Sequence, residues 1–306
     1  MTSRIETEYE RIRAGHRAEL NRRLNDISLR VPELQVIADE RAALVSAVGA
    51  GKLSPAEALE KHRLLTAREA ELMRLNGITR EDMQLHYSCE KCRDTGWLGS
   101  GVKQPCSCRL IKEALLDEKH AINARETFET FDASLFADDN QRVLSCKVRD
   151  FCLGFADALP SPEKPFLLIL GDTGLGKSFF GNAIAYRALE RGIPAMRVTA
   201  YDWLQGVLDG MRDNGTPESS AIRTPLLSLD DLGSEPNIPN ISNEHLFALI
   251  NDRMTSRRPT VIGTNLNPQQ LSDRYGDRIY MRLTDRTLVT IIQLKGESLR
   301  GRVRPC

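Results

Sequence analysis

The sequence predicts an α/β fold with a mainly parallel five-stranded sheet, preceded by an α-helical N-terminal region and a small metal-binding unit. In the second half of the chain, short apolar runs alternate with helix-forming stretches, as in sheets whose parallel strands are joined by helices. The first run ends in a glycine-rich turn, and four cysteines cluster ahead of it. The five apolar runs are residues 166–170, 195–198, 226–230, 260–264 and 288–294.

The composition is that of a globular protein with two or three domains. Of its 306 residues, 41% are hydrophobic and 27% are charged. No apolar run reaches the ~18 residues of a membrane-spanning helix, and the N-terminus lacks an apolar signal segment, so we expect a cytoplasmic protein with no membrane partner. The net charge is zero, but residues 270–306 carry 8 Lys and Arg against 4 Asp and Glu, whereas residues 125–269 carry 14 against 19. A basic C-terminal end weakly favours an anionic partner.

Residues 1–86 are predicted to be a helical region that binds a partner. The first apolar stripe recurs every three or four residues and consists of Ile5, Tyr9, Ile12, His16, Leu20, Leu24 and Ile27. Val31-Pro32 interrupts it, and a second stripe consists of Leu34, Ile37, Arg41, Leu44, Val45 and Val48. Ser54-Pro55 begins a third helix, lined by Leu59, His62, Leu65, Leu72 and Leu75. The stripes indicate either a self-packed helical domain or a surface that docks on another protein, and the two interpretations are compatible.

Residues 87–124 contain the four clustered cysteines. Cys89 and Cys92 form a CxxC pair, Cys106 and Cys108 form a CxC pair, and 13 glycine-rich residues separate the pairs. In a reducing cytosol this spacing favours a structural Zn²⁺ site, with unpaired cysteines or a redox pair as alternatives. Four thiolates close the coordination sphere of zinc, so we expect no catalysis at this metal. Cys146 is predicted to be a core residue, and so is Cys152.

The glycine-rich turn predicts a site for a nucleoside triphosphate. Residues 171–178 fit the pattern G-x-x-x-x-G-K-[ST] between a strand and a helix, where backbone N–H groups and the helix N-terminus attract phosphates. We expect Lys177 to bind the β- and γ-phosphates and Ser178 to ligate Mg²⁺. The predicted nucleotide contacts in this turn are Gly171, Asp172, Thr173, Gly174, Leu175, Gly176, Lys177, Ser178 and Phe179.

Polar residues at the ends of two later strands complete the predicted site. Asp230 and Asp231 end the third apolar run, where the first carboxylate is expected to hold Mg²⁺ and the second to orient the attacking water. Because aspartate is one methylene shorter than the more usual glutamate, hydrolysis is expected to be slow. Glu235 follows on the next turn as a further candidate. Asn265 ends the fourth run, either as a ligand of the γ-phosphate or the water, or as a turn residue.

Arginines recur every fourth residue near the C-terminal end. They are Arg274, Arg278, Arg282 and Arg286. Their spacing predicts one helix face, which would be either a solvated face paired with the interleaved aspartates or a source of an arginine for a phosphate in the same chain or a neighbouring one. The segment 298–304 adds three more arginines.

In these motifs the chain resembles the AAA+ replicative-helicase loaders of bacteria and their phages, and more loosely the ATPase subunits of some transposition systems. The matching stretches are residues 87–96, 106–108, 171–178, 229–235, 264–266, 274–279 and 298–302. The phosphate-binding turn alone is not specific, whereas its combination with the cysteine unit is. Residues 1–86 match only in being helical and in their place in the chain.

The resemblance implies roles that the residues alone do not establish. Residues 125–306 would be an AAA+ ATPase domain that binds single-stranded DNA and forms ATP-dependent oligomers, and residues 1–86 would bind the hexameric replicative helicase. Asn265 looks like the sensor 1 residue, Arg278 like the arginine finger that reaches a neighbour's ATP, and Arg300 like the sensor 2 residue acting in its own chain. Arg282 sits in the same motif as Arg278 and could share its role.

The implied function is ATP-dependent loading of the helicase, with hydrolysis driving release and with ATP, Mg²⁺ and Zn²⁺ as cofactors. Two alternatives remain open. One is a transposition helper that coats duplex DNA, although a four-cysteine unit is not typical of that group. The other is a nucleotide-gated adaptor with little turnover, which the aspartate at position 231 would allow.

Overall fold

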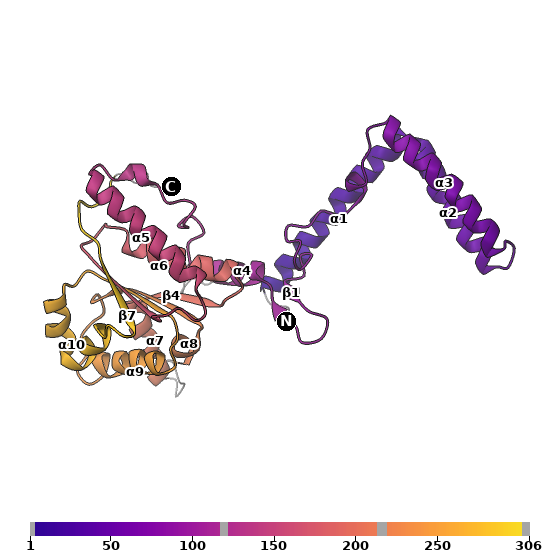
Figure 1. Cartoon of the computed structure of the whole chain (residues 1–306). Helices are drawn as coiled ribbons and strands as arrows, with labels where there is room; N and C mark the ends of the chain where they lie inside the picture. Colours follow the sequence, from indigo (N-terminus) through magenta and orange to yellow (C-terminus); the bar gives the residue numbers. More distant parts are fainter. Residues whose placement is uncertain (1–3, 117–121, 213–218, 302–306) are drawn as a thin grey trace. The chain divides into compact units, whose positions relative to one another are not determined.

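The computed structural model describes residues 4–116, 122–212 and 219–301 (Figure 1). Contacts between residues divide the chain into two compact units, Met1–Gly96 and Trp97–Cys306. The division falls between the second and the third of the four clustered cysteines. The boundaries expected after residues 86 and 124 stay predictions.

The first unit is helical. Its elements are α1 (Arg4–Arg30), α2 (Pro32–Gly49), α3 (Pro55–Leu75) and the 3₁₀ turn η1 (Glu81–Met83). Proline is tolerated in the first turn of a helix, and Pro32 begins α2 in this way. Ser54 caps α3 through a capping box with Glu57. Helices α2 and α3 lie side by side (Figure 1), and Arg41 of α2 pairs with Glu69 of α3 at 2.7 Å.

The apolar stripes of α1 and α2 face inward except at Val45, which is 75% exposed, and the stripe expected on α3 is partly wrong. Along α3, all of which the structure describes, no side chain is fully buried. Leu65 is half-buried against its neighbours, whereas Leu59 is 55% exposed and Leu75 is 64% exposed. At about 100° per residue, Leu59 lies roughly 120° around the helix from Leu65. A pair of helices buries only a narrow row of side chains, so the leucines of α3 outside that row remain exposed.

The second unit begins with a short hairpin and ends in the α/β domain. The antiparallel strands β1 (Trp97–Leu98) and β2 (Gln104–Pro105) precede α4 (Ser107–Leu116), η2 (Ala133–Leu135) and α5 (Asp139–Asp157). The sheet strands are β3 (Phe166–Leu170), β4 (Ala195–Thr199), β5 (Leu226–Leu232), β6 (Thr260–Thr264) and β7 (Val289–Gln293). The helices among them are α6 (Lys177–Glu190), α7 (Ala200–Arg212), α8 (Ser219–Arg223), α9 (Ser242–Thr255) and α10 (Pro268–Leu283).

The predicted fold class is confirmed. Every apolar run of the prediction forms a strand, and these five strands pair in parallel in the order β4-β5-β6-β3-β7. This order places β6 between β3 and β5, and Asn265 directly follows β6. Strand β3 is buried on both faces, because Leu167 packs toward α5 and α6 while Leu168 packs toward α9 and α10 (Figure 1).

Within the described residues, no helix is both long and apolar enough to cross a membrane.

Candidate functional site

The phosphate-binding turn joins β3 to α6 at the carboxyl edge of the sheet, where sites of open parallel sheets form. Gly174 and Gly176 adopt left-handed conformations with φ of 87° and 93°. A Cβ at Gly174 would lie 2.1 Å from Ser298 Oγ, so only glycine allows the C-terminal segment to approach the turn this closely. Gly176 directly precedes α6, whose free N–H groups begin at the turn.

The Lys177 side chain folds back over the turn. Its Nζ donates hydrogen bonds to the carbonyl oxygens of Gly171 and Asp172, both at 2.8 Å, and to Asn265 Oδ1 at 2.5 Å. Burial lowers the pKa of Lys177, while the nearby carboxylates of Asp231, Asp230 and Asp172 oppose that shift. The structure therefore brings Lys177 and Asn265, predicted separately, into direct contact.

Ser178 and Asp230 also meet, as expected for two groups that share a metal. Ser178 Oγ donates to Asp230 Oδ1 at 3.1 Å, and both are oxygen donors of the kind that Mg²⁺ prefers. The other carboxylate oxygen, Oδ2, accepts a hydrogen bond from Arg197 Nη2 at 2.6 Å. Sequence reasoning missed Arg197, because it meets Asp230 only through the pairing of β4 with β5.

Asp231 reaches the site through a backbone irregularity. Successive strand residues normally point to opposite faces, which would separate Asp230 from Asp231. The pairing of β5 with β6 shifts register between Leu229 and Leu232, and Asp231 has a left-handed φ of 54°. Its Oδ1 accepts a hydrogen bond of 2.7 Å from Asn265 Nδ2. One asparagine amide thus bridges the lysine and the second aspartate.

A pocket of about 560 Å³ adjoins the phosphate-binding turn, which is within the usual range for small-molecule sites. It is lined by the turn, by Phe179, by residues 299–301 and by the segment 125–136. The segment's contribution to the pocket includes Arg125, Glu126, Thr130, Phe131 and Asp132.

Asn182, which the sequence analysis missed, fixes the start of that segment. It is fully buried on α6. Its Nδ2 donates to the carbonyl oxygens of Asn123 at 2.8 Å and Glu126 at 2.7 Å, and its Oδ1 accepts from the Asn123 N–H at 2.8 Å. An asparagine flanked by apolar residues in a helix was the available signal, because buried amides nearly always have hydrogen-bond partners.

The structure places Arg300 beside the phosphate-binding turn of its own chain. The Leu299 N–H donates to the Gly174 carbonyl at 2.9 Å, and Arg300 lines the pocket. Its guanidinium is one of the charges that act on Lys177. Arg302, the second arginine of that motif, lies outside the described residues.

The arginine series does not form one helix face, so that expectation is wrong. Helix α10 is broken at Gly276, where φ is 73° and ψ is 170°. Arg274 precedes the break and donates a hydrogen bond to the Glu235 carbonyl oxygen. Arg278 follows the break, and its guanidinium carbon lies 3.8 Å from the ring centre of Phe247 on α9. Arg282 lies 6.0 Å from the same ring, and Arg286 follows the end of α10.

Two further candidates lie outside the nucleotide pocket. Among the described residues that line the pocket, Arg278 is missing, so the structure does not bring it to the nucleotide site of its own chain. Glu235 is buried and points into the loop that carries it, where its carboxylate accepts hydrogen bonds from the Gly233 N–H and the Tyr275 hydroxyl.

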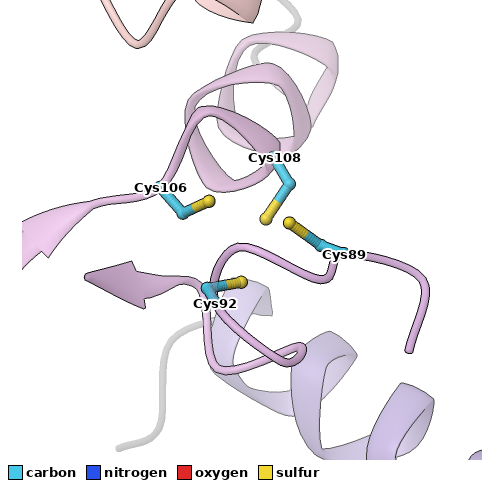
Figure 2. Close-up of side chains that lie close together, drawn as sticks. All are labelled: Cys89, Cys92, Cys106 and Cys108. Carbon is cyan, nitrogen blue, oxygen red and sulfur yellow. The ribbon is translucent and has the colours of Figure 1, made fainter. Parts of the chain in front are cut away.

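The four clustered cysteines converge. In the described residues their Sγ atoms all lie within 4.8 Å of one another (Figure 2). Zn–S bonds of ~2.3 Å in a tetrahedron require sulfurs roughly 3.8 Å apart, so the arrangement fits zinc. Cys89 and Cys92 come from a loop, Cys106 lies between β2 and α4, and Cys108 is in the first turn of α4 (Figure 2).

The CxxC loop is held in place before any metal is considered. The Asp94 carboxylate accepts hydrogen bonds from the N–H groups of Ser88 and Cys89, both at 2.9 Å, and the Gly96 N–H donates to Cys92 Sγ at 3.4 Å. The ring of Tyr9 on α1 packs so closely that a Cβ at Gly96 would lie 2.8 Å from it. Such contacts orient metal ligands and fix their charge.

A profile of known relatives, described as IstB-like ATP binding protein, matches residues 114–305, which is more than half of the chain. Replicative helicase loader DnaI of Bacillus subtilis strain 168 is 26% identical over 151 residues, which cover 49% of this chain and 47% of that protein. The putative ATP-binding protein of insertion sequence IS5376 from Geobacillus stearothermophilus is 29% identical over 185 residues, 58% of this chain and 69% of that protein.

A crystal structure of the DnaC helicase loader superposes with a TM-score of 0.48 at 18% identity, covering 56% of this chain and 98% of that chain. The resemblance to helicase loaders that the motifs predicted is confirmed, and so is the looser resemblance to a transposition ATPase. The chain spans about half the length of the curated loaders that it matches.

Proposed function

Since the chain belongs to the family of IstB-like ATP-binding proteins, we propose that it is an ATPase that loads a replicative DNA helicase. The observation that carries the ATPase part is the convergence of Lys177, Ser178, Asp230 and Asp231 at the carboxyl ends of β3 and β5. The loader part is supported by the likeness to DnaI and by the joining of a four-cysteine unit to this ATPase domain.

Each side chain has a defined task in hydrolysis. Lys177 exchanges at least two of its present partners for the β- and γ-phosphates, and Ser178 and Asp230 would hold Mg²⁺. Mg²⁺, when bound, neutralises the charge that develops on the phosphate oxygens. Asp231 accepts a proton from the attacking water, and Asn265 orients that water molecule. Arg300 contacts the phosphates of its own chain, and Arg278 contacts those of a neighbouring chain in an oligomer.

The four cysteines hold a structural Zn²⁺ that stabilises the segment 89–108. This stretch has little apolar core of its own, so metal binding would supply a large part of its folding free energy. Because four thiolates fill the coordination sphere, the metal has no catalytic role in this proposal.

Residues 1–86 bind the hexameric helicase, and the ATPase domain binds single-stranded DNA through its phosphates. The support for the first contact is the exposed leucines of α3, since Leu59 and Leu64 are 55% and 65% exposed. The support for the second is the excess of basic residues over acidic ones in 270–306. ATP binding would order the subunits, and hydrolysis would release the helicase.

The experiment mixes the full chain with the replicative helicase of its host, with ATP and single-stranded DNA present. We expect a complex in which Leu59→Ser and Leu64→Ser together weaken helicase binding at least tenfold, while Glu60→Ser on the same helix leaves it unchanged. We also expect Lys177→Ala to lose ATP binding and ATP-dependent assembly. A wild-type chain that binds ATP but forms no complex with the helicase would remove the loader proposal and leave the ATPase.

A second candidate is a transposition helper, which the likeness to the IS5376 protein favours. The ATPase domain would be similar, but the DNA would be duplex. Competition between single-stranded and duplex DNA of equal length separates the two, since a preference for duplex DNA would reverse the ranking.

A nucleotide-gated adaptor with little turnover is the third candidate, because the residue at 231 is an aspartate. Phosphate release by the wild-type chain, measured with DNA and compared with Asp231→Ala, distinguishes an enzyme from a switch. Equal release by both would favour the switch.

A further inference from the structure

The loop after Asp231 ends in a buried contact with helix α10 that the proposed chemistry does not use. Glu235 is 4% exposed. One carboxylate oxygen accepts a hydrogen bond from the Tyr275 hydroxyl and the other accepts from the Gly233 N–H at 2.9 Å. Arg274 donates to the Glu235 main-chain oxygen, and its guanidinium lies 3.5 Å from the carboxylate. Burial and the Glu235 charge raise the pKa of Tyr275 far above its usual value, so the hydroxyl remains a donor.

The loop between Asp231 and Glu235 is closed on itself. The Ser234 N–H donates to the Asp231 carbonyl at 3.0 Å, and Thr264 Oγ1 donates to the Leu232 carbonyl at 2.6 Å. A Cβ at Gly233 would lie 2.8 Å from the Leu266 side chain, so the loop has little room to deform locally. A shift of Asp231 would therefore carry the loop with it.

The other side of Asp231 leads to the phosphate site. Asn265 connects the Asp231 carboxylate to Lys177 through hydrogen bonds of 2.7 and 2.5 Å. The three N–H donors of Lys177 are all engaged, so contact with two phosphate groups requires the release of at least two present partners. Release of Asn265 would change the partners of Asp231 as well.

The far end of the same chain of contacts leads to Arg278. Tyr275 directly precedes Gly276, where a positive φ of 73° breaks α10 into two parts. Arg278 is the third residue after Tyr275 and rests against Phe247, with Glu244 3.8 Å away. Its side chain is 67% exposed, so reorienting the side chain costs only these weak surface contacts. Ile279 and Leu283 of the same segment are buried in the core.

We propose that Glu235, Tyr275 and Arg274 form a latch that sets the position of residues 277–283 according to whether phosphate contacts Lys177. The proposal rests on the proposed function, in which ATP binds the turn and Arg278 serves a neighbouring chain. In it, the occupied site of one subunit prepares that subunit to complete the next site. The latch residues position Arg278 and do not touch the nucleotide.

A purely structural role for the latch makes a different prediction. A structural contact would change stability equally with and without nucleotide, whereas coupling appears only as a difference between the two states. Coupling between sites usually amounts to about 5–150-fold in an equilibrium constant. Proximity alone does not establish such a pathway, so the test must measure coupling itself.

The test measures hydrogen–deuterium exchange of residues 277–283 in the full chain, with and without ATP and Mg²⁺. The chain is diluted until sedimentation shows a monomer, so that contacts with a neighbour make no contribution. Tyr275→Phe removes one hydroxyl and keeps the ring, and Glu235→Gln is the second variant. Tyr280→Phe, on the same helix but outside the latch, is the matched control.

We expect ATP to change the exchange of 277–283 in the wild-type chain and in Tyr280→Phe. In Tyr275→Phe and Glu235→Gln we expect ATP affinity within about twofold of wild type, no response of 277–283 and ATP-dependent assembly weakened roughly tenfold. Normal responses in both latch variants would overturn the latch. So would ATP binding by the wild-type chain without any change in 277–283. A wild-type chain that binds no ATP would overturn the proposed function and the latch together.

Discussion

Replacing Arg253 by methionine should destabilise the α/β domain strongly. Arg253 lies on α9 with a fully buried side chain. Its guanidinium donates to five acceptors, which are the carbonyl oxygens of Ala221, Ile222, Thr224 and Pro259 and the hydroxyl of Thr260, at 2.5–3.1 Å. Methionine keeps the length and the apolar packing of the side chain but offers none of these donors.

The expected loss follows from the acceptors that remain. Hydrogen bonds from a charged group contribute about 1.5–3 kcal/mol each, but burying the charge costs several kcal/mol, so the five bonds do not simply add. The Pro259 carbonyl keeps the Leu227 N–H and the Ile222 carbonyl keeps Arg258 as donors. The Ala221 and Thr224 carbonyls lose the donor that Arg253 supplies, and each carbonyl left without a donor costs about 1–3 kcal/mol. Thr260 keeps a partner, because its hydroxyl donates to the Arg258 carbonyl. We therefore expect the free energy of unfolding to fall by about 3–5 kcal/mol.

Urea unfolding followed by circular dichroism measures this loss. The exposed Arg223, changed to methionine, is the control and should shift the free energy of unfolding by less than about 0.5 kcal/mol. Arg253→Lys should fall between, since an ammonium has three donors. A loss below about 1 kcal/mol for Arg253→Met would refute the reasoning, because it would mean that water or a rearranged backbone satisfies the carbonyls.

Three further changes test other parts of the structure. Burial raises the pKa of the Cys152 thiol to about 12. An alkylating reagent at pH 8 should therefore modify the half-buried Cys146 on the same helix first, which peptide mass spectrometry can follow. Equally fast reaction of Cys152 in the native protein would count against this prediction. Asn182→Ala should weaken ATP binding about 10–100-fold but tripolyphosphate binding little. The substitution removes the hydrogen bonds that hold residues 123–126 and leaves the phosphate-binding turn unchanged. Calorimetry that showed equal losses of affinity for the two ligands would contradict this. The chain should hold one zinc ion by metal analysis, and a chelator or Cys106→Ser should remove it and expose residues 89–108 to protease; unchanged proteolysis would argue against a structural metal.

The parts of the fold that depend on local pattern were predictable from the sequence. Each strand of the sheet appears as a short apolar run. Residues 171–178 have the spacing of glycine, lysine and serine that is typical of a phosphate-binding turn. Asp230 and Asn265 could be assigned to one site because the carboxyl ends of parallel strands meet at one edge.

What the sequence did not predict depends on contacts between distant residues. Asn182 forms hydrogen bonds with Asn123 and Glu126, which lie 59 and 56 positions earlier in the sequence. Arg197 contacts Asp230 from the neighbouring strand. No periodicity encodes such pairs. The arginine series was misinterpreted for a different reason, since the glycine at 276 was an available signal of a break and a four-residue repeat has meaning only on an unbroken helix.

In the proposed function, capture of a nucleotide at Lys177 would be an exchange of partners. The Lys177 ammonium has three oxygens around it, so an arriving phosphate would compete with the protein's own amide and carbonyls and not with water alone. The measured affinity for ATP would then report how much more strongly the Lys177 ammonium interacts with phosphate oxygens than with these protein oxygens. In the same arrangement the Asp231 carboxylate accepts a hydrogen bond from Asn265, so an exchange at Lys177 that released Asn265 would reach Asp231 as well.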